Sequence, residues 1–159
     1  MNAPFVLFAE EAQLLQARCG ELCESAYANA VFLIDRDGQL LAKAGVTDRI
    51  DVTSLASLAA GNVAATDGLA KLFVEEKFPV QFHEGERESI HISQVGARFI
   101  LIVLFDQRSS VGLVRLRVRK AQGPLLELFE QVRARSQSRQ EAALPALSDD
   151  EIDNLFSDS

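Results

Sequence analysis

Apolar residues follow two different periods along this chain, and the changes of period divide it into predicted elements. Over residues 8–27 the apolar positions lie three and four residues apart, which predicts an amphipathic helix. Five shorter apolar runs predict strands: residues 30–34, 39–44, 81–85, 89–95 and 98–105. The last run is apolar almost throughout, so we expect a central strand that is buried on both faces. Asp37-Gly38, between the first two runs, predicts a tight hairpin.

A second helix is predicted over residues 51–73, and its two faces differ in side-chain size. Large residues lie on one face: Leu55, Leu58, Leu69 and Phe73. Small residues lie on the other face: Thr53, Ser57, Ala60, Gly61, Ala64 and Gly68. We expect the large face to pack against the sheet. Each glycine costs about 1 kcal/mol relative to alanine, so we expect close docking of the small face on another protein surface to compensate. The pattern also allows a helix buried on both sides within one domain.

The segment over residues 109–135 follows two periods at once. Arginines alternate with apolar residues at 115–119, as in a strand, but apolar residues at helical spacing extend over the whole segment. The longer match favours a helix, which Pro124 should kink. We interpret the three arginines at 115, 117 and 119 as a solvated helix surface or one that faces the tail.

The C-terminal residues differ in character from the rest. Residues 136–147 are rich in Ser, Gln and Ala, which predicts a flexible linker. Ser-Asp-Asp-Glu at 148–151 is a capping box, and Ile152, Leu155 and Phe156 follow it at helical spacing. Isolated helices below about 12 residues are marginal in water, so we expect this one to fold only when it docks on a partner. The alternative is a solubilising end without a binding role.

Together these elements predict an α/β fold of the α+β type. Three helices enclose one five-stranded, mostly antiparallel sheet in an α/β/α sandwich, and a flexible tail follows. The predicted domain covers residues 1–135, and residues 136–159 form the linker and the short amphipathic C-terminal helix.

The composition fits one globular domain with an appendage: 159 residues, 48% apolar and 25% charged. The net charge of -7 argues against general nucleic-acid binding and against anionic membrane surfaces, which both attract basic proteins. No apolar run is long enough to span a membrane, and the first residues lack the features of a secretory signal. Two cysteines imply no disulfide framework, so we expect a cytoplasmic protein.

No motif for catalysis or cofactor binding is recognised in the sequence, and glycine-rich nucleotide-binding loops are absent. Cys19 and Cys23 could ligate a metal together with His83 or His91, but the four lack a recognised metal spacing. Because the cysteines continue an apolar helix stripe, we interpret them as buried thiols. We interpret His83 as part of an exposed strand edge. The sequence therefore predicts no catalytic residue, no metal, no cofactor and no self-contained enzyme.

The order of elements, the Phe-Leu-Ile-Asp-Arg-Asp-Gly hairpin and the small-faced middle helix resemble the roadblock/dynein light chain family. Four blocks resemble a bacterial branch of that family that acts in cell polarity and gliding motility. They are Asp51-Val-Thr-Ser-Leu-Ala-Ser-Leu-Ala-Ala-Gly-Asn-Val-Ala-Ala of the middle helix, Phe82-His-Glu-Gly, Gly112-Leu-Val-Arg-Leu-Arg and the closing Asp-Asp-Glu-Ile-Asp-Asn-Leu-Phe-Ser. The resemblance extends over nearly the whole chain and implies a roadblock-type fold for residues 1–135.

The resemblance implies a homodimeric GTPase-activating protein for a Ras-like small GTPase, with two copies of the chain per GTPase and paired middle helices. It implies that the dimer supplies no arginine finger but remodels the switch loops, so that the GTPase's own Arg and Gln reach the γ-phosphate. It also implies a tail contact remote from the nucleotide and a location at a cell pole. The expected partner-binding residues are Ala60, Ala64, Ala65, Gly68 and Leu69 of the helix, and Ile152, Leu155 and Phe156 of the tail.

Two other functions remain open at this point. One is a non-catalytic scaffold of the same fold, which binds a GTPase without accelerating hydrolysis and which the sequence cannot separate from an activator. The other is a small-molecule sensor. The absence of a convergent polar cluster in the strands weighs against the sensor.

Overall fold

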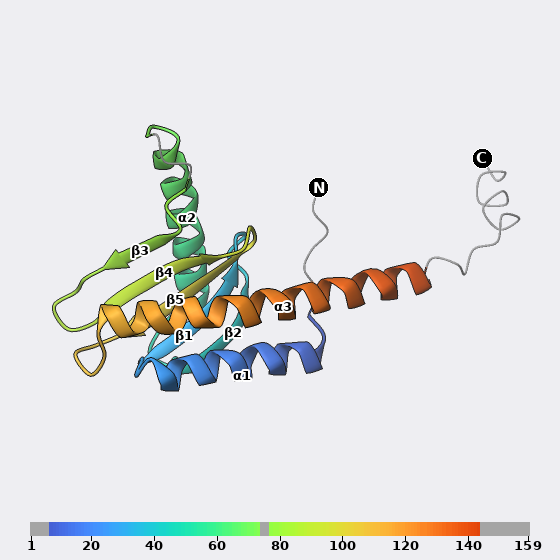
Figure 1. Cartoon of the computed structure of the whole chain (residues 1–159), viewed down its shortest axis with the longest axis horizontal. Coiled ribbons are helices and arrows are strands. Elements are labelled where there is room, and N and C mark those ends of the chain that lie inside the picture. The colour runs from blue at the N-terminus through green and yellow to red at the C-terminus, as the bar shows by residue number, and fades with distance from the viewer. Residues whose placement is uncertain (1–6, 74–76, 144–159) are drawn as a thin grey trace, which may run out of the picture.

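The computed structural model describes residues 7–73 and 77–143, which form a three-layered sandwich (Figure 1). The elements follow in this order: α1 (Ala9–Ser25), β1 (Ala30–Asp35), β2 (Leu40–Gly45), α2 (Val52–Ala70), β3 (Val80–His83), β4 (Ser89–Val95), β5 (Phe99–Phe105) and α3 (Val111–Ala143). α1 and α3 cover one face of the sheet, and α2 covers the other. Within the described residues, the predicted α/β fold with three helices and five strands is confirmed.

All neighbouring strands are antiparallel, in the order β2-β1-β5-β4-β3. β5 lies in the middle, and all its residues are buried except the half-buried Leu104, which confirms the prediction of a central strand. β3 lies at one edge and ends at His83, earlier than predicted. The strand ends there because residues 84–88 are mostly charged and all exposed.

Alternate residues of the strands point to opposite layers, as the pleat of a sheet requires. In β1, Val31 and Leu33 belong to the core under α1 and α3, whereas Phe32 and Ile34 belong to the core under α2. The neighbouring β5 follows the same alternation, since Leu101 lies opposite Leu33. The sheet therefore separates two hydrophobic cores.

The β1–β2 hairpin is closed by its own side chains, as Asp37-Gly38 predicted. The buried carboxylate of Asp35 accepts hydrogen bonds through Oδ1 from the backbone N–H groups of Asp37 at 3.0 Å and Gln39 at 2.9 Å. Gly38 has a φ of 88°, a conformation that side chains with a Cβ rarely adopt. Local residues alone thus determine this turn.

α2 packs against the sheet through a face different from the predicted one. Its buried residues are small: Ala56, Ala59, Val63 and Ala70. Leu58 and Leu69, from the predicted large face, are instead 74% and 53% exposed. The helix is therefore turned by about one residue step, or roughly a quarter turn, from the expected orientation. Branched Ile92, Ile100 and Ile102 fill the sheet side of this core, so small helix residues opposite them allow a close approach.

The ends of the first two helices differ little from prediction. α1 buries Leu15, Cys19 and Leu22 at the expected spacing. α2 ends at Ala70, and Phe73 lies exposed after it, so the prediction that Phe73 packs against the sheet is wrong. Of the predicted large face, Leu55 is half-buried and packs against the core.

α3 is longer than predicted, because it continues past Arg135 to Ala143. The prediction of a flexible linker is therefore wrong for residues 136–143. The helix also continues through Pro124, which is exposed. The missing N–H of this proline would have bonded to the carbonyl of Lys120, an exposed residue where water can replace the bond. The rest of the predicted linker and the short C-terminal helix, residues 144–159, lie outside the described residues.

Contacts with α1 explain why α3 extends so far. Glu11 of α1 carries a carboxylate, yet it is only 1% exposed. One carboxylate oxygen accepts a hydrogen bond from the backbone N–H of Phe8 at 3.1 Å, and the other lies 3.8 Å from a guanidinium nitrogen of Arg135. The guanidinium of Arg139 lies 3.7 Å from the ring centroid of Phe8. The extension of α3 thus covers the first turn of α1.

One histidine lies deep in the core beneath α3. His91 of β4 is 1% exposed, and neither ring nitrogen has a hydrogen-bond partner among the described residues. Burial, with the nearby positive charge of Arg115, lowers the pKa of His91 from its usual value of 6.5. The folded protein therefore keeps His91 neutral at pH values where the unfolded chain already binds a proton.

We predict that stability falls as pH drops below about 6.5, because only the unfolded chain gains the proton of His91 in that range. Above that pH this residue contributes no pH dependence. The slope from one proton is at most about 1.4 kcal/mol per pH unit. Urea unfolding at pH 7.5, 6.5 and 5.5 measures it, and His91→Leu should flatten the curve. His83→Leu is the matched control, since His83 is exposed on the edge strand. An unchanged slope in His91→Leu would contradict the prediction.

Candidate functional site

The outer face of α2 is the side that points away from the sheet. Its exposed residues are Thr53, Ser54, Ser57, Leu58, Gly61, Ala64, Ala65, Gly68 and Leu69. Four of the predicted partner-binding residues, Ala64, Ala65, Gly68 and Leu69, therefore lie together on this face. The fifth, Ala60, is half-buried and packs against the core at the edge of the helix. The three predicted tail residues, at positions 152, 155 and 156, lie outside the described residues.

The outer face of α2 is suited to close contact with another chain. A Cβ placed on Gly61 or Gly68 would meet no atom within 4 Å, apart from neighbouring backbone of the helix itself, so open space lies above both residues. Leu58 and Leu69 add exposed apolar area beside them. None of the residues on this face is titratable. The face therefore offers shape and apolar area for binding, without a group for acid–base chemistry.

The start of α2 is fixed by its N-cap. The side chain of Asp51 accepts hydrogen bonds from the backbone N–H of Ser54 at 3.3 Å and from its hydroxyl at 2.8 Å. These bonds to Ser54 lower the pKa of the Asp51 carboxyl, so it stays ionised. A carboxylate at this position also interacts favourably with the helix dipole.

The C-terminal half of α2 is held by side-chain hydrogen bonds that sequence reasoning missed. Arg36 of the β1–β2 turn donates to Asp67 at 2.7 Å and to the side-chain oxygen of Gln94 at 2.6 Å. The Gln94 amide in turn donates to Asp67 at 3.3 Å. On the neighbouring residue, the Thr66 hydroxyl accepts a hydrogen bond from the Gln81 side chain at 2.6 Å. No sequence motif predicts these contacts, because the two residues of each hydrogen bond lie 15 to 58 positions apart in the chain.

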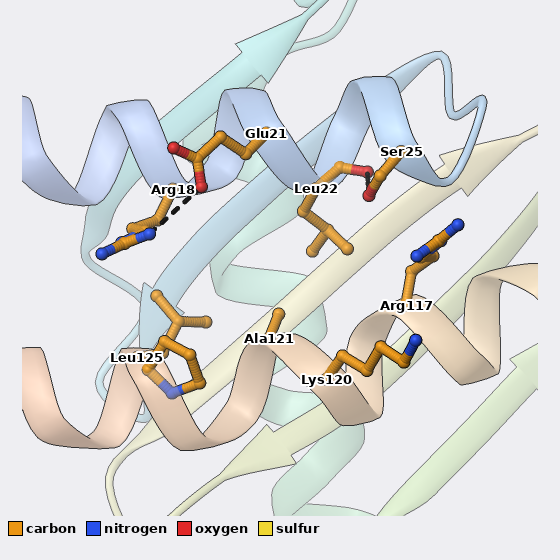
Figure 2. Close-up of a pocket in the computed structure, with 9 residues that line it drawn as sticks. Arg18, Glu21, Leu22, Ser25, Arg117, Lys120, Ala121 and Leu125 are labelled. Carbon is orange, nitrogen blue, oxygen red and sulfur yellow. Dashed lines mark hydrogen bonds and ion pairs between the residues drawn. The ribbon is translucent and has the colours of Figure 1, made fainter.

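A groove of about 290 Å³ lies between α1 and α3, on the opposite face of the sheet from α2. Figure 2 shows Arg18 and Glu21 of α1 beside it, joined by an ion pair at 3.2 Å, and Arg117 and Lys120 of α3 on the other side. Of the three arginines at 115, 117 and 119, Arg117 is half-buried in this groove, while the other two are exposed. The groove is thus predominantly basic, and it does not include any predicted partner-binding residue.

The candidate metal ligands do not form a site. Cys19 and Cys23 are free and buried, which confirms that they are core thiols. Burial, with a smaller effect of Cys23, raises the pKa of Cys19 to about 12, so its reactive thiolate form is rare at neutral pH. Within residues 7–73 and 77–143, no group of three or more His, Cys, Asp or Glu residues is placed to hold a metal ion. In the same residues no helix is both long and apolar enough to cross a membrane.

Comparison with known proteins identifies relatives of this architecture. A family model described as the Roadblock/LC7 domain matches residues 15–105. A comparison with curated proteins found no match.

Several solved structures are similar to this chain in both fold and sequence. MglB of Myxococcus xanthus is 52% identical, with a TM-score of 0.75, and the match covers 80% of this chain and 96% of that one. The gliding protein MglB of Thermus thermophilus is 31% identical, with a TM-score of 0.71, over 82% of this chain and 99% of that one. An MglB described as having a tetrameric arrangement is 29% identical, with a TM-score of 0.76, over 83% and 99% of the two chains. The similarity extends over almost the full length of all three relatives.

We predict that Gly68→Arg leaves the fold intact, whereas Ala59→Arg unfolds it. An arginine at position 68 extends into open space, but one at position 59 would bury an unpaired charge under the sheet. Thermal unfolding followed by circular dichroism measures both. Gly68→Arg should change the melting temperature by a few degrees at most, since an exposed substitution usually shifts stability by about 0.5 kcal/mol. A collapse of Gly68→Arg comparable to that of Ala59→Arg would show that the outer face is internal.

Proposed function

The chain belongs to the roadblock/LC7 family, and from that premise we propose that it is a homodimeric GTPase-activating protein for a Ras-like small GTPase of the MglA type. The observation that carries the proposal is the 52% identity with Myxococcus xanthus MglB over 96% of that chain. The outer face of α2 supports it, because exposed leucines without titratable neighbours favour contact with another protein. The proposed setting is bacterial cell polarity and gliding motility, in the cytoplasm at a cell pole.

The proposed mechanism is positioning. Phosphoryl transfer is accelerated mainly by correct placement of groups and by stabilisation of developing charge. A protein that offers only shape and apolar contact can supply placement by holding the switch loops of its partner. In this proposal, the GTPase's own Arg and Gln then reach the γ-phosphate, and this chain contributes no catalytic residue and no arginine finger. It needs no cofactor for that role.

We propose that the binding surface is shared between two copies. One edge of the sheet is β3, a four-residue strand without a further strand beside it in the described residues. Val80 and Phe82 of this strand are 40% and 38% exposed, which favours pairing with a second copy. Pairing across this edge would bring two α2 helices near each other. One GTPase would then contact residues such as Ala64, Ala65, Gly68 and Leu69 from both copies, beside the half-buried Ala60.

We further propose that the C-terminal segment makes a second contact with the GTPase, remote from the nucleotide. The proposal rests on its sequence pattern. Ile152, Leu155 and Phe156 provide an apolar stripe, and Asp149, Asp150 and Glu151 provide a negative first turn. A segment tethered to a protein that is already bound has a high effective concentration, so even a weak contact adds to affinity.

The experiment that tests the proposed function is a GTP-hydrolysis assay with a purified MglA-type GTPase. We expect acceleration by the wild-type chain, whose dimer is checked by light scattering, and at least a tenfold loss of stimulation with Ala64→Arg or Gly68→Arg. Binding without acceleration would identify the alternative, a non-catalytic scaffold. Absence of binding would contradict both. Gln16→Arg is the control, because it adds the same charge at an exposed position of α1, on the opposite face of the sheet from α2.

The same assay tests the absence of an arginine finger. Such a finger is worth about a thousandfold or more in rate. Single replacements of Arg36, Arg49, Arg87, Arg108 and Arg115 by Ala should therefore cost far less than that at saturating activator. A thousandfold loss for any one of them would mean that this chain supplies a catalytic arginine.

We predict that deletion of residues 148–159 leaves the dimer intact but weakens binding to the GTPase or slows assembly of the complex. Phe156→Ala should have part of the same effect, because it removes the largest residue of the apolar stripe. Titration calorimetry and nucleotide-release kinetics measure these effects. Deletion of residues 157–159 alone is the control, since it leaves the stripe complete. Identical affinity and release rates after the longer deletion would contradict a tail contact.

A further inference from the structure

The orientation of α2 about its own axis does not follow from its apolar residues. Its buried face consists of three alanines and a valine, while Leu58 and Leu69 remain exposed. A turn of about one residue step would bury those leucines instead, and larger apolar side chains gain more free energy from burial. Closer approach of the small face to the isoleucines of the sheet offsets that gain. Polar contacts at the edges of the buried face then decide between the two orientations.

Two consecutive polar residues, Thr66 and Asp67, lie on either side of the buried face. At about 100° per residue, Val63 and Ala70 fall between them on the helix circumference. Thr66 accepts a hydrogen bond from Gln81 of edge strand β3 at 2.6 Å. Asp67 accepts a hydrogen bond from Arg36 of the β1–β2 turn at 2.7 Å, on the other side of the buried face. The two contacts therefore oppose rotation of the helix in opposite directions.

The contact at Asp67 is a closed triangle. Arg36 donates from one nitrogen to Asp67 and from another to the Gln94 side chain at 2.6 Å, and Gln94 donates to Asp67 at 3.3 Å. Three elements meet here: the β1–β2 turn, α2 and β4. Because each group is bound by the two others, moving Asp67 would break more than one hydrogen bond. The planar guanidinium also makes the geometry strict.

We propose that Arg36, Gln94 and Gln81 are positioning residues, which act through Asp67 and Thr66 to fix the rotation of α2 and so select the face offered to a partner. The part of this inference that concerns the partner rests on the proposed function. The part that concerns the rotation of α2 does not.

These contacts set orientation without contributing much stability. The side chains of Arg36 and Asp67 are 37% and 32% exposed, and ion pairs at such partly exposed sites are screened by water. Directional hydrogen bonds nevertheless distinguish between packings that differ little in free energy, as polar residues do in helix pairs. Their removal should therefore loosen the orientation of α2 while the domain stays folded.

Cysteine labelling tests the rotation directly. Ala59→Cys places a thiol on the buried face of α2, and native Cys19 in α1, 1% exposed, reports unfolding of the whole domain. Each rate is measured by mass spectrometry of the labelled peptides, with and without the double replacement Thr66→Val and Asp67→Ala. We expect labelling at position 59 to rise at least tenfold while Cys19 stays as slow as before. No change at position 59, or an equal rise at both positions, would overturn the inference.

Two controls separate the specific contact from a general loss of charge. Asp67→Asn keeps an oxygen that can accept from Arg36, so with Thr66 intact it should keep labelling at position 59 slow. Arg18→Ala breaks an exposed ion pair of 3.2 Å on α1 and should have no effect there. Fast labelling in either control would contradict a role for the geometry at Asp67.

The functional arm uses the MglA-type GTPase and compares half-saturation with maximal stimulation. Loss of the two contacts should raise the activator concentration needed for half-maximal stimulation about tenfold or more, while the plateau stays within about twofold of wild type. The double charge exchange Arg36→Asp with Asp67→Arg can re-form an ion pair. It should therefore show a higher affinity than either of these two replacements alone. Unchanged half-saturation despite faster labelling would overturn the link to the partner. If the wild-type chain gives no stimulation, the proposed function fails, while the labelling result still decides the rotation.

Discussion

The fold depends on the need to cover a sheet whose central strands are buried on both faces. β1 and β5 carry apolar residues towards both layers, so water must be excluded on each side. Two antiparallel helices, α1 and α3, do this on one face (Figure 1). A single helix does it on the other, and it can cover the branched residues of the sheet only by approaching closely. Small residues on α2 meet that requirement, and they leave its own leucines pointing outward.

This arrangement divides the contacts of α2 into two kinds. The alanines and Val63 exclude water but bury little area, so they give a modest driving force at about 25 cal/mol per Å². The hydrogen bonds of Thr66 and Asp67 add direction. A helix held in this way is close to the sheet and defined in rotation, yet its outer face stays free of charged groups. A larger apolar contact would have used Leu58 and Leu69 for the core.

Local signals in the sequence predicted the elements, and non-local contacts explain what they missed. The hairpin at Asp37-Gly38 and the central strand follow from neighbouring residues alone. The prediction for the buried face of α2 was wrong because residue size favoured the leucines, whereas the side chains that oppose this face, Ile92, Ile100 and Ile102, lie in strands much further along the chain. The predicted end of α3 was wrong for a similar reason, because Arg135 and Arg139 contact Glu11 and Phe8 at the start of α1, far away in the sequence.

The same limit applies to the candidate site. Ala64, Ala65 and Gly68 could be placed on the outer face of α2 because small size and helical period can be read from a sequence. Leu69 lies on that face too, although its size predicted contact with the sheet. Ala60 shares the size but lies at the edge of the buried face, where period alone does not separate core from surface. The sequence did not indicate that Arg36, Gln81 and Gln94 contact α2, because each is an ordinary residue for a turn or a strand.

A protein that activates a GTPase without a reactive group of its own, as proposed for this chain, depends on accurate placement. Side-chain atoms on a helix lie about 5 Å from its axis, so a rotation of about 20° moves them by roughly 2 Å. A shift of that size separates atoms that attract each other at about 3.5–4.0 Å, so complementary contacts with a partner are lost. Hydrogen bonds that contribute little to stability can therefore matter greatly to the affinity for the proposed partner, provided that they fix which atoms of α2 meet it. In the proposed complex, the hydrogen bonds of Thr66 and Asp67 would therefore matter to binding as much as Gly68 on the outer face of α2.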